Sequence, residues 1–150
     1  MRRSARSPVT TVLGLLAATT AALTLMSVTA ANANAKTYSG QFAGGGAIIL
    51  KVSDGRLRQV AARMPAGCEN NHGGRWVRTL EVNVKGAVAL RSGRFSVQGK
   101  APNGVRGDLR GRLRNGAISG SLRLTYVYID HFGVDESYLC DTGTRRFRAD

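Results

Sequence analysis

Side chains that could do chemistry gather in two stretches of the chain, residues 68–76 and 130–141. The candidate binding residues in them are Glu69, His72, Arg75, Trp76, Asp130, His131, Asp135 and Glu136. Ser137, His131 and Asp130 are the residue types of a serine hydrolase, in which a histidine activates the hydroxyl and a carboxylate orients the histidine. Their spacing matches no nucleophile elbow, no metal-binding histidine pair and no phosphate-binding loop. We therefore expect a non-catalytic binding surface, with no catalytic residue, metal ion or cofactor, and we keep a secreted hydrolase as the alternative.

The chain has an excess of basic residues, several of them close together at residues 106–114. The chain has 22 Lys and Arg against 9 Asp and Glu, a formal net charge of +13. The candidate anion-binding residues are Arg106, Arg110, Arg112 and Arg114. Such an excess favours acidic partners, so anionic cell-envelope or extracellular polymers are an alternative kind of ligand. We expect no specific nucleic-acid binding, because binding of single strands usually needs aromatic side chains among the basic ones.

The N-terminus has the pattern of a secretory signal peptide. Arginines near the start precede an uncharged run from Ser7 to Ala35, which ends in an Ala-Asn-Ala cleavage pattern. We expect a signal peptide over residues 1–35, a secreted protein or one associated with the cell envelope, and no stable membrane span after cleavage. The uncharged run is long, so retention of residues 9–31 as a membrane anchor is the alternative. Residues 36–150 are enough for one domain with one core.

Cys68 and Cys140 are the only cysteines of the chain. In an exported protein an even number of cysteines indicates a disulfide, so we expect these two to be bonded. The bond would close a loop of about 70 residues and contribute about 4 kcal/mol in the chain-entropy model.

Alternation of apolar and polar residues between Val105 and Leu124 predicts a β-hairpin. Asn115-Gly116 is a strong type I′ turn signal, because both residues accept positive φ. The expected pairs are Leu113 with Ile118, Gly111 with Gly120, Leu109 with Leu122, Gly107 with Leu124 and Val105 with Tyr126, and on the polar face Arg112 with Ser119, Arg110 with Ser121 and Asp108 with Arg123. The tripeptide Arg106-Gly107-Asp108 then lies on a strand, paired across it, and not at the exposed loop tip that an adhesion motif requires.

Ser92-Gly93 and Asp54-Gly55 are two further turn signals. The expected pairs are Leu90 with Phe95, Val88 with Val97 and Val52 with Leu57. A bulge near Arg58-Gln59 is needed to keep the residues that follow in phase. The long alternating run from Trp76 to Arg91 is expected to form one strand, bent at Gly86.

These patterns predict an all-β fold. The expected strands are residues 37–43, 46–53, 56–64, 76–91, 94–100, 104–114, 117–129 and 144–149. Consecutive strands should run antiparallel as a meander, and the first and last should pair, so we expect a small closed barrel with one disulfide; a β-sandwich is the alternative. The loops 65–75 and 130–143 would lie at one end and hold the two cysteines. We expect this long-loop end to be the binding surface, because loops on a rigid scaffold commonly carry function.

Several short stretches follow a recurrent pattern: a first cysteine, a Gly-Xaa-Phe-Ser strand start, Gly-rich strands, and a Cys-x-x-Gly before a final aromatic strand. They are Cys68, "SGRFSV" at 92–97, "GVRGDLRGRL" at 104–113, "AISGSLRL" at 117–124 and "CDTGTRRFRA" at 140–149. In them the chain resembles small secreted actinobacterial all-β proteins of unknown function. "CENNHGGR" departs from the pattern, where a simpler Cys-Xaa-Gly turn is typical. The resemblance implies export, a disulfide and an all-β fold, and it implies no activity.

Overall fold

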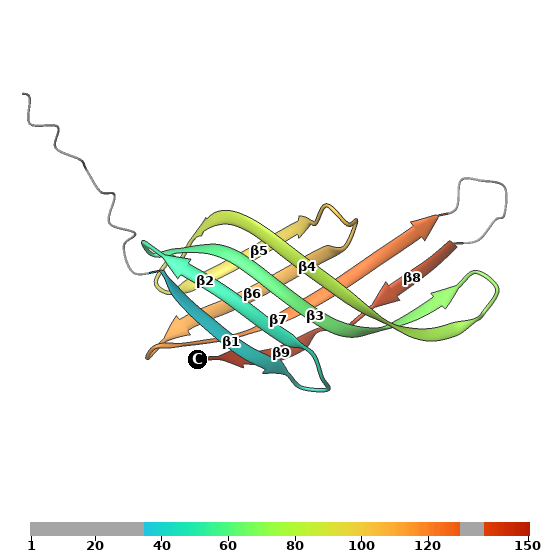
Figure 1. Cartoon of the computed structure of the whole chain (residues 1–150), viewed down its shortest axis with the longest axis horizontal. Helices are drawn as coiled ribbons and strands as arrows, with labels where there is room; N and C mark the ends of the chain where they lie inside the picture. Colours follow the sequence, from blue (N-terminus) through green and yellow to red (C-terminus); the bar gives the residue numbers. More distant parts are fainter. Residues whose placement is uncertain (1–34, 130–136) are drawn as a thin grey trace, which may run out of the picture. The chain divides into compact units, whose positions relative to one another are not determined.

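The computed structural model describes residues 35–129 and 137–150, and the predicted signal peptide therefore lies outside the described residues except for its last position. The described chain is all-β, and its strands run antiparallel (Figure 1). The strands are β1 (Lys36–Phe42), β2 (Ala47–Ser53), β3 (Arg56–Asn70), β4 (Arg75–Ala89), β5 (Arg94–Lys100), β6 (Arg106–Arg114), β7 (Ala117–Ile129), β8 (Ser137–Asp141) and β9 (Arg145–Ala149). The predicted all-β fold is confirmed.

Hydrogen bonds join the strands in the order β4-β3-β2-β1-β9-β7-β6-β5, and β8 lies off this path, between β3 and β7. The first and last strands pair as predicted, with Phe42 opposite Phe147. Because β8 bonds both β3 and β7, the strands β1, β2, β3, β8, β7 and β9 form a hydrogen-bonded ring. A barrel closed through every strand stays a prediction, because β4 and β5 are the two ends of the path.

The β6–β7 hairpin has the predicted register. Every expected pair from Arg112–Ser119 and Leu113–Ile118 through Gly107–Leu124 is present. Asn115 and Gly116 have φ of 51° and 78°, as a type I′ turn requires. The expected pair of Val105 with Tyr126 is absent, since β6 begins at Arg106.

The turn at Asp54-Gly55 is also confirmed. Val52 lies opposite Leu57, and the register shifts so that Lys51 lies opposite Gln59, which makes Arg58 the bulged residue. The same bulge appears on the other side of β3, where Leu57 pairs with Val88 and Gln59 with Lys85. Gly86 lies within this shift, at the bend expected in the long strand.

Strands β4 and β5 differ from the expected hairpin. Ser92 and Gly93 make the predicted turn, with φ of 50° and 74°, but the two strands share only the bridge between Arg91 and Arg94. Val88 pairs with Leu57 of β3 instead of Val97. After the turn β4 pairs with β3 and β5 pairs with β6, so β4 and β5 are the two ends of the strand order.

The expected loop over residues 65–75 is wrong. Residues 65–70 continue β3, which pairs with β4 as far as Glu69 opposite Arg75. On its side away from β4, β3 changes partner around Pro65: the last pair with β2 is at Arg63 and the first pair with β8 is at Gly67. No ladder bond is needed at Pro65 on that side, so its missing N–H removes none.

The expected loop over residues 130–143 is wrong in its second half. Residues 137–141 form β8, which inserts between β3 and β7. Residues 130–136 lie outside the described part of the chain. Both cysteines therefore lie on strands and not in loops, and Cys68 is directly opposite Cys140.

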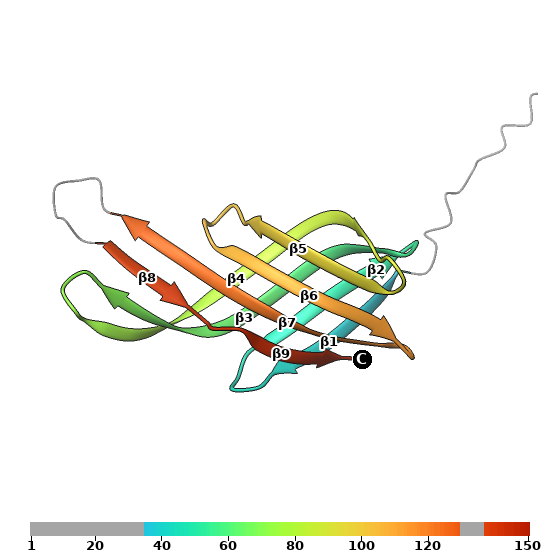
Figure 2. The same ribbon diagram turned by 180° about the vertical axis from the view of Figure 1, so that it is seen from behind.

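The core lies between two halves of the sheet that cross in Figures 1 and 2, strands β2–β4 and strands β5–β7. Both halves contribute fully buried side chains, among them Leu50 and Met64 from the first and Ile118 and Leu124 from the second. Phe95 and Phe147 lie opposite Gly111 and Gly120, and a Cβ on either glycine would meet a phenylalanine ring at 2.4 Å or 2.9 Å. The glycines thus leave room for two rings against the strands.

Candidate functional site

The outward positions of β5, β6, β7 and β9 carry a dense array of cations, which we call the basic face. Its members are Arg94, Lys100, Arg106, Arg110, Arg112, Arg114, Arg123, Arg146 and Arg148. Strands β5, β6 and β7 run side by side in Figure 2. Alternation explains the arrangement, since the residues between these cations, such as Leu109 and Ile118, point into the core.

Cations on the basic face lie directly opposite one another. Arg94 of β5 pairs in register with Arg112 of β6, and Lys100 pairs with Arg106. Like charges directly opposite on neighbouring strands destabilise a sheet. Within the described residues, six of the nine cations make no ion pair: Arg94, Lys100, Arg106, Arg112, Arg114 and Arg146. The face therefore carries positive charge that the described chain leaves uncompensated.

The ion pairs of the face leave most of that charge unchanged. Arg110 Nε lies 3.3 Å from Asp108, and Arg148 Nε lies 3.3 Å from Asp150. Asp108 also accepts a hydrogen bond from Gln98, at 3.0 Å. Asp108 faces Arg123 in the register, as predicted, but the predicted pairing is replaced: Arg123 bonds Asp141 of β8.

Arg123 and Asp141 form the strongest ion pair of this surface. Arg123 Nε donates to Oδ1 and Oδ2 of Asp141 at 3.0 Å and 3.1 Å, and its Nη2 donates to Oδ2 as well. The hydrogen bond from Arg123 holds the pKa of Asp141 below its ordinary value, helped by the Gly143 backbone N–H, and the same bond raises the pKa of Arg123. The Asp141 carboxylate therefore joins β8 to β7 through Arg123, and its oxygens are already hydrogen-bonded.

An open groove of about 670 Å³ crosses the basic face. It is lined by Gln98, Lys100, Arg106, Asp108, Arg123 and Thr125, among others. Three of these are cations and one is a carboxylate that already accepts two partners. The groove is thus suited to an anion that lies along the surface.

A second feature lies where β4, β3, β8 and β7 extend together, at residues 75–78, 67–70, 137–141 and 125–129, which we call the far end. The disulfide between Cys68 and Cys140 lies in its middle, in a row that runs from Trp76 through both cysteines to Tyr126. The predicted disulfide is confirmed. It cross-links β3 and β8, the two inner strands of the far end.

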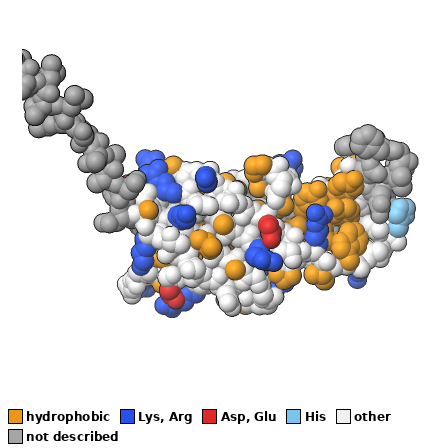
Figure 3. Space-filling model, in the orientation of Figure 1, with side chains coloured by type: hydrophobic (Ala, Val, Ile, Leu, Met, Phe, Trp, Pro, Cys, Tyr) orange, Lys and Arg blue, Asp and Glu red, His pale blue; other side chains and the backbone are white. Residues whose placement is uncertain are grey.

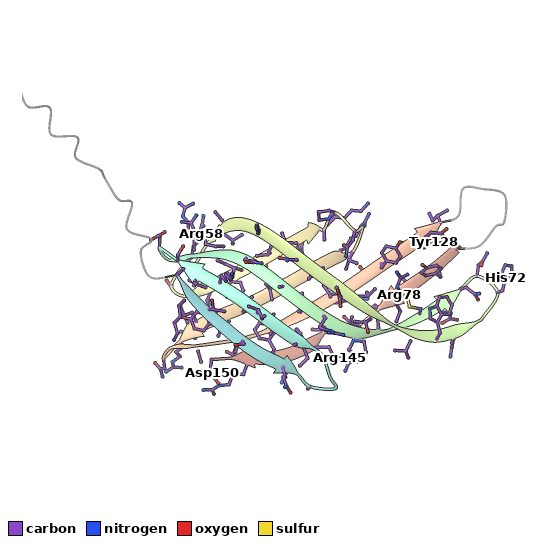
Figure 4. All side chains as sticks on the ribbon, in the orientation of Figure 1. Arg58, His72, Arg78, Tyr128, Arg145 and Asp150 are labelled. Carbon is purple, nitrogen blue, oxygen red and sulfur yellow. A yellow bond between two sulfur atoms is a disulfide. The ribbon has the colours of Figure 1, made fainter. Side chains whose placement is uncertain are left out.

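One face of the far end is aromatic. The ring of Tyr138 stacks on Tyr128 at 4.9 Å and meets Trp76 edge-on at 5.2 Å. Arg78 donates to the Tyr138 hydroxyl at 2.8 Å and lies 5.3 Å from the Tyr126 ring centre. Trp76 and Tyr128 are each 38% exposed. Figure 4 shows Arg78 and Tyr128 on this part of the sheet, with His72 at its tip.

The opposite face of the far end is aliphatic. Leu139 lies opposite Val127, Ile129 follows on β7, and Val77 lies on β4. Their exposed fractions run from 49% for Leu139 to 74% for Val77. Figure 3 shows hydrophobic side chains gathered at the end of the sheet that carries the pale blue histidine.

The predicted binding residues fall into two groups. Glu69 and Arg75 form an ion pair at 3.3 Å across the β3–β4 hairpin, and His72 lies in its turn, where Asn70 Oδ1 accepts the His72 and Gly74 backbone N–H groups. Asp130, His131, Asp135 and Glu136 lie outside the described residues. The predicted anion-binding residues Arg106, Arg110, Arg112 and Arg114 share the outward side of β6.

Two features of this surface were not predicted from the sequence. The basic face is wider than the four arginines of β6, because β5, β7 and β9 align their own cations with it. The apolar character of the far end was missed because "TYVYI" and "SYLCD" read as strand or loop residues with one face in a core. The available signal was the loss of alternation, since residues 126–129 are apolar on both sides of the strand.

No family model, curated protein or solved structure matches the chain. In residues 35–129 and 137–150 there is no group of three or more His, Cys, Asp or Glu that could hold a metal ion. The same part of the chain contains no helix able to cross a membrane.

Proposed function

We propose that the chain is a non-catalytic binding protein that uses the basic face to hold a polyanion outside the cell. The observation that carries this proposal is the in-register juxtaposition of cations, Arg94 with Arg112 and Lys100 with Arg106. Such pairs cost stability in the free protein. An anionic polymer running along β5 and β6 would neutralise both pairs, which stand at opposite ends of this ladder.

The extracellular location is part of the proposal. The Cys68–Cys140 bond and the signal-peptide pattern of residues 1–35 both support it, because disulfides persist mainly in oxidising compartments. The ligand class is an anionic polymer of the cell envelope or its surroundings.

Aromatic side chains are absent from the basic face, whose members alternate with Ser, Thr, Gln and Asp. Recognition would therefore depend on charge and not on stacking. The hydrolase alternative depends on Asp130 and His131, which lie outside the described residues, and stays a prediction.

The test uses inorganic polyphosphate as the probe and measures Kd over about 50 to 300 mM NaCl. A protein that contacts several phosphates shows a steep linear fall of log K with log salt, at about 0.7 to 0.9 per contact. The triple variant Arg106→Gln, Arg110→Gln, Arg112→Gln should lower that slope by about 2 to 3.

The matched control removes the same charge elsewhere. Lys51→Gln, Arg56→Gln and Lys85→Gln change exposed cations outside the basic face. The control should leave the slope within about 1 of the unsubstituted protein. Equal loss in the two triple variants would mean that net charge alone attracts polyphosphate, and the proposed face would be wrong.

A further inference from the structure

Apolar exposure in this protein is concentrated at one place. Eight large hydrophobic residues are exposed in the described part of the chain, and six of them lie at the far end: Trp76, Val77, Val127, Tyr128, Ile129 and Leu139. The other two, Ile49 and Val84, stand elsewhere on the sheet surface. Scattered exposed hydrophobics are ordinary, but a gathered set marks a surface that another phase or molecule covers.

Both faces of the far end carry exposed apolar side chains. Trp76, Tyr128 and Tyr138 lie on one side of the four strands, and Val127 and Leu139 lie on the other. A protein docked on one side would leave the other side in water. A lipid interface would cover both sides together.

The composition of the far end fits the interfacial layer of a bilayer. Trp and Tyr place an apolar ring in the acyl region and a polar group among the headgroups. The turn at the tip is polar, with Asn70 Oδ1 accepting backbone N–H groups, and the Glu69–Arg75 ion pair lies in the same row as Leu139 and Val127. Full insertion of that ion pair would be costly, so the geometry restricts the far end to a shallow position.

The basic face continues into the far end along β7. The outward residues of this strand are Arg123, Thr125, Val127 and Ile129 in succession, and Lys100 and Arg106 flank Thr125 on β5 and β6. Cations beside a short apolar segment are the two signals that together hold a peripheral protein on an anionic membrane.

We propose that the polyanion held by this protein is the surface of an anionic lipid bilayer, with the far end inserted shallowly and the basic face against the headgroups. This inference depends on the function proposed above for the basic face. Its distinctive claim is that Trp76 enters the interface on binding.

The far end contains the only tryptophan of the chain, so Trp76 fluorescence reports this site alone. The full chain is mixed with vesicles of phosphatidylglycerol and phosphatidylcholine, or of phosphatidylcholine only. On the anionic vesicles the Trp76 emission should shift to the blue and become protected from a soluble quencher, and on neutral vesicles it should stay unchanged. An unshifted emission on anionic vesicles would overturn the proposal.

Variants separate the apolar contribution from charge. Val127→Ser with Ile129→Ser should reduce partition into anionic vesicles about tenfold and leave polyphosphate binding unchanged. Ile49→Ser with Val84→Ser, also exposed aliphatic residues, at 43% and 39%, should change neither. All variants keep residues 1–34, so any contribution of that segment is common to them.

The remaining outcomes distinguish the two proposals. Polyphosphate binding that requires the basic face, without any Trp76 shift on vesicles, would overturn the membrane proposal and leave the proposed function intact. Absence of both polyphosphate binding and the Trp76 shift would overturn both proposals. A fall in sedimentation mass on Val127→Ser with Ile129→Ser, again without a Trp76 shift, would assign the far end to a second copy of the chain instead.

Discussion

Asp141 is the residue through which β8 is tied to its neighbours. It accepts hydrogen bonds from Arg123 of β7 and from the Gly143 backbone N–H, at 2.8 Å for the latter. Its pKa is lowered, chiefly by the hydrogen bond from Arg123. Because the folded state holds the ionised form, the contribution of Asp141 to stability is complete above its unfolded pKa, about 3.9, and is lost as the pH falls through the lower folded value.

Asp141→Asn should therefore lower the free energy of unfolding by about 1 kcal/mol near neutral pH. The difference from the unsubstituted protein should disappear as the pH falls below about 4, since protonated Asp141 no longer attracts Arg123. Urea unfolding at a series of pH values measures both effects. Asp150→Asn, in a more exposed pair with Arg148, is the control and should cost less; a constant difference at all pH values would contradict the linkage.

Gly120 shows how one residue sets the packing of an element. A Cβ there would lie 2.2 Å from the Arg110 carbonyl oxygen and 2.9 Å from the Phe147 ring. A Cβ at Gly99 would meet nothing within 4 Å. The same chemical change is therefore expected to differ sharply between two strand glycines.

Gly120→Ala should destabilise the protein by about 1 to 3 kcal/mol, because backbone and ring must both shift. Gly99→Ala should be nearly neutral. Thermal unfolding of the two variants side by side measures the contrast. Equal melting temperatures would show that β6 and β7 move apart easily at Gly120.

At the scale of elements, the joint between β8 and β9 is the feature that the strand pattern did not predict. The expected strand at 144–149 is present as β9, but residues 137–141, expected in a loop, form the additional strand β8, with Thr142 between the two strands. Thr142 is buried, its Oγ1 accepts the Leu124 N–H at 2.9 Å, and its own N–H donates to the Leu124 carbonyl at 3.0 Å. The side chain thus continues the ladder with β7 where the backbone turns, so β8 can reach β3 while β9 stays with β1.

The disulfide links β8 covalently to β3. The double variant Cys68→Ala with Cys140→Ala should lose about 4 kcal/mol of unfolding free energy, because the bond spans 72 residues of sequence. Trp76 faces Cys68 across the β3–β4 ladder, so its emission reports unfolding at this site. In the double variant we expect the far end to unfold before the β6–β7 hairpin. A single transition shared by both regions would contradict this expectation.

At the scale of the whole molecule, the cations of the basic face lower the stability of the sheet and would favour binding of an anion. Arg94 and Arg112 repel across the β5–β6 ladder, and Arg112 makes no ion pair in the described residues. The protein keeps a charge arrangement that weakens its own sheet, which is the pattern expected of a surface made for a ligand of opposite charge.

Arg112→Ser should raise the melting temperature by about 2 °C at low salt, because one repulsive pair is removed. The same change should weaken polyphosphate binding. The gain in stability should shrink at high salt, where the repulsion is screened. Calorimetry at two salt concentrations measures it, and a lower melting temperature at low salt would show that Arg112 has a stabilising partner.

The sequence alone determined the local geometry of this protein. Alternation and two-residue turns decide which side of a strand is buried and which residues face each other, so the β6–β7 pairs, the Arg58 bulge and the outward arginines of β6 were predictable. Two cysteines admit only one intramolecular bond, so the pairing of Cys68 with Cys140 was predictable too. These features depend on residues close in sequence or on simple counting.

Apart from the predicted pairing of β1 with β9, only the tertiary structure decided which strands meet over long separations. β8 inserts between β3 and β7, Arg123 takes Asp141 as its partner instead of Asp108, and β4 separates from β5. Each outcome depends on how distant strands compete for the same edge, which no local pattern records. The exposed far end follows from strand pairing as well: its strands extend past most of the core, so apolar residues on both sides of β7 remain at the surface.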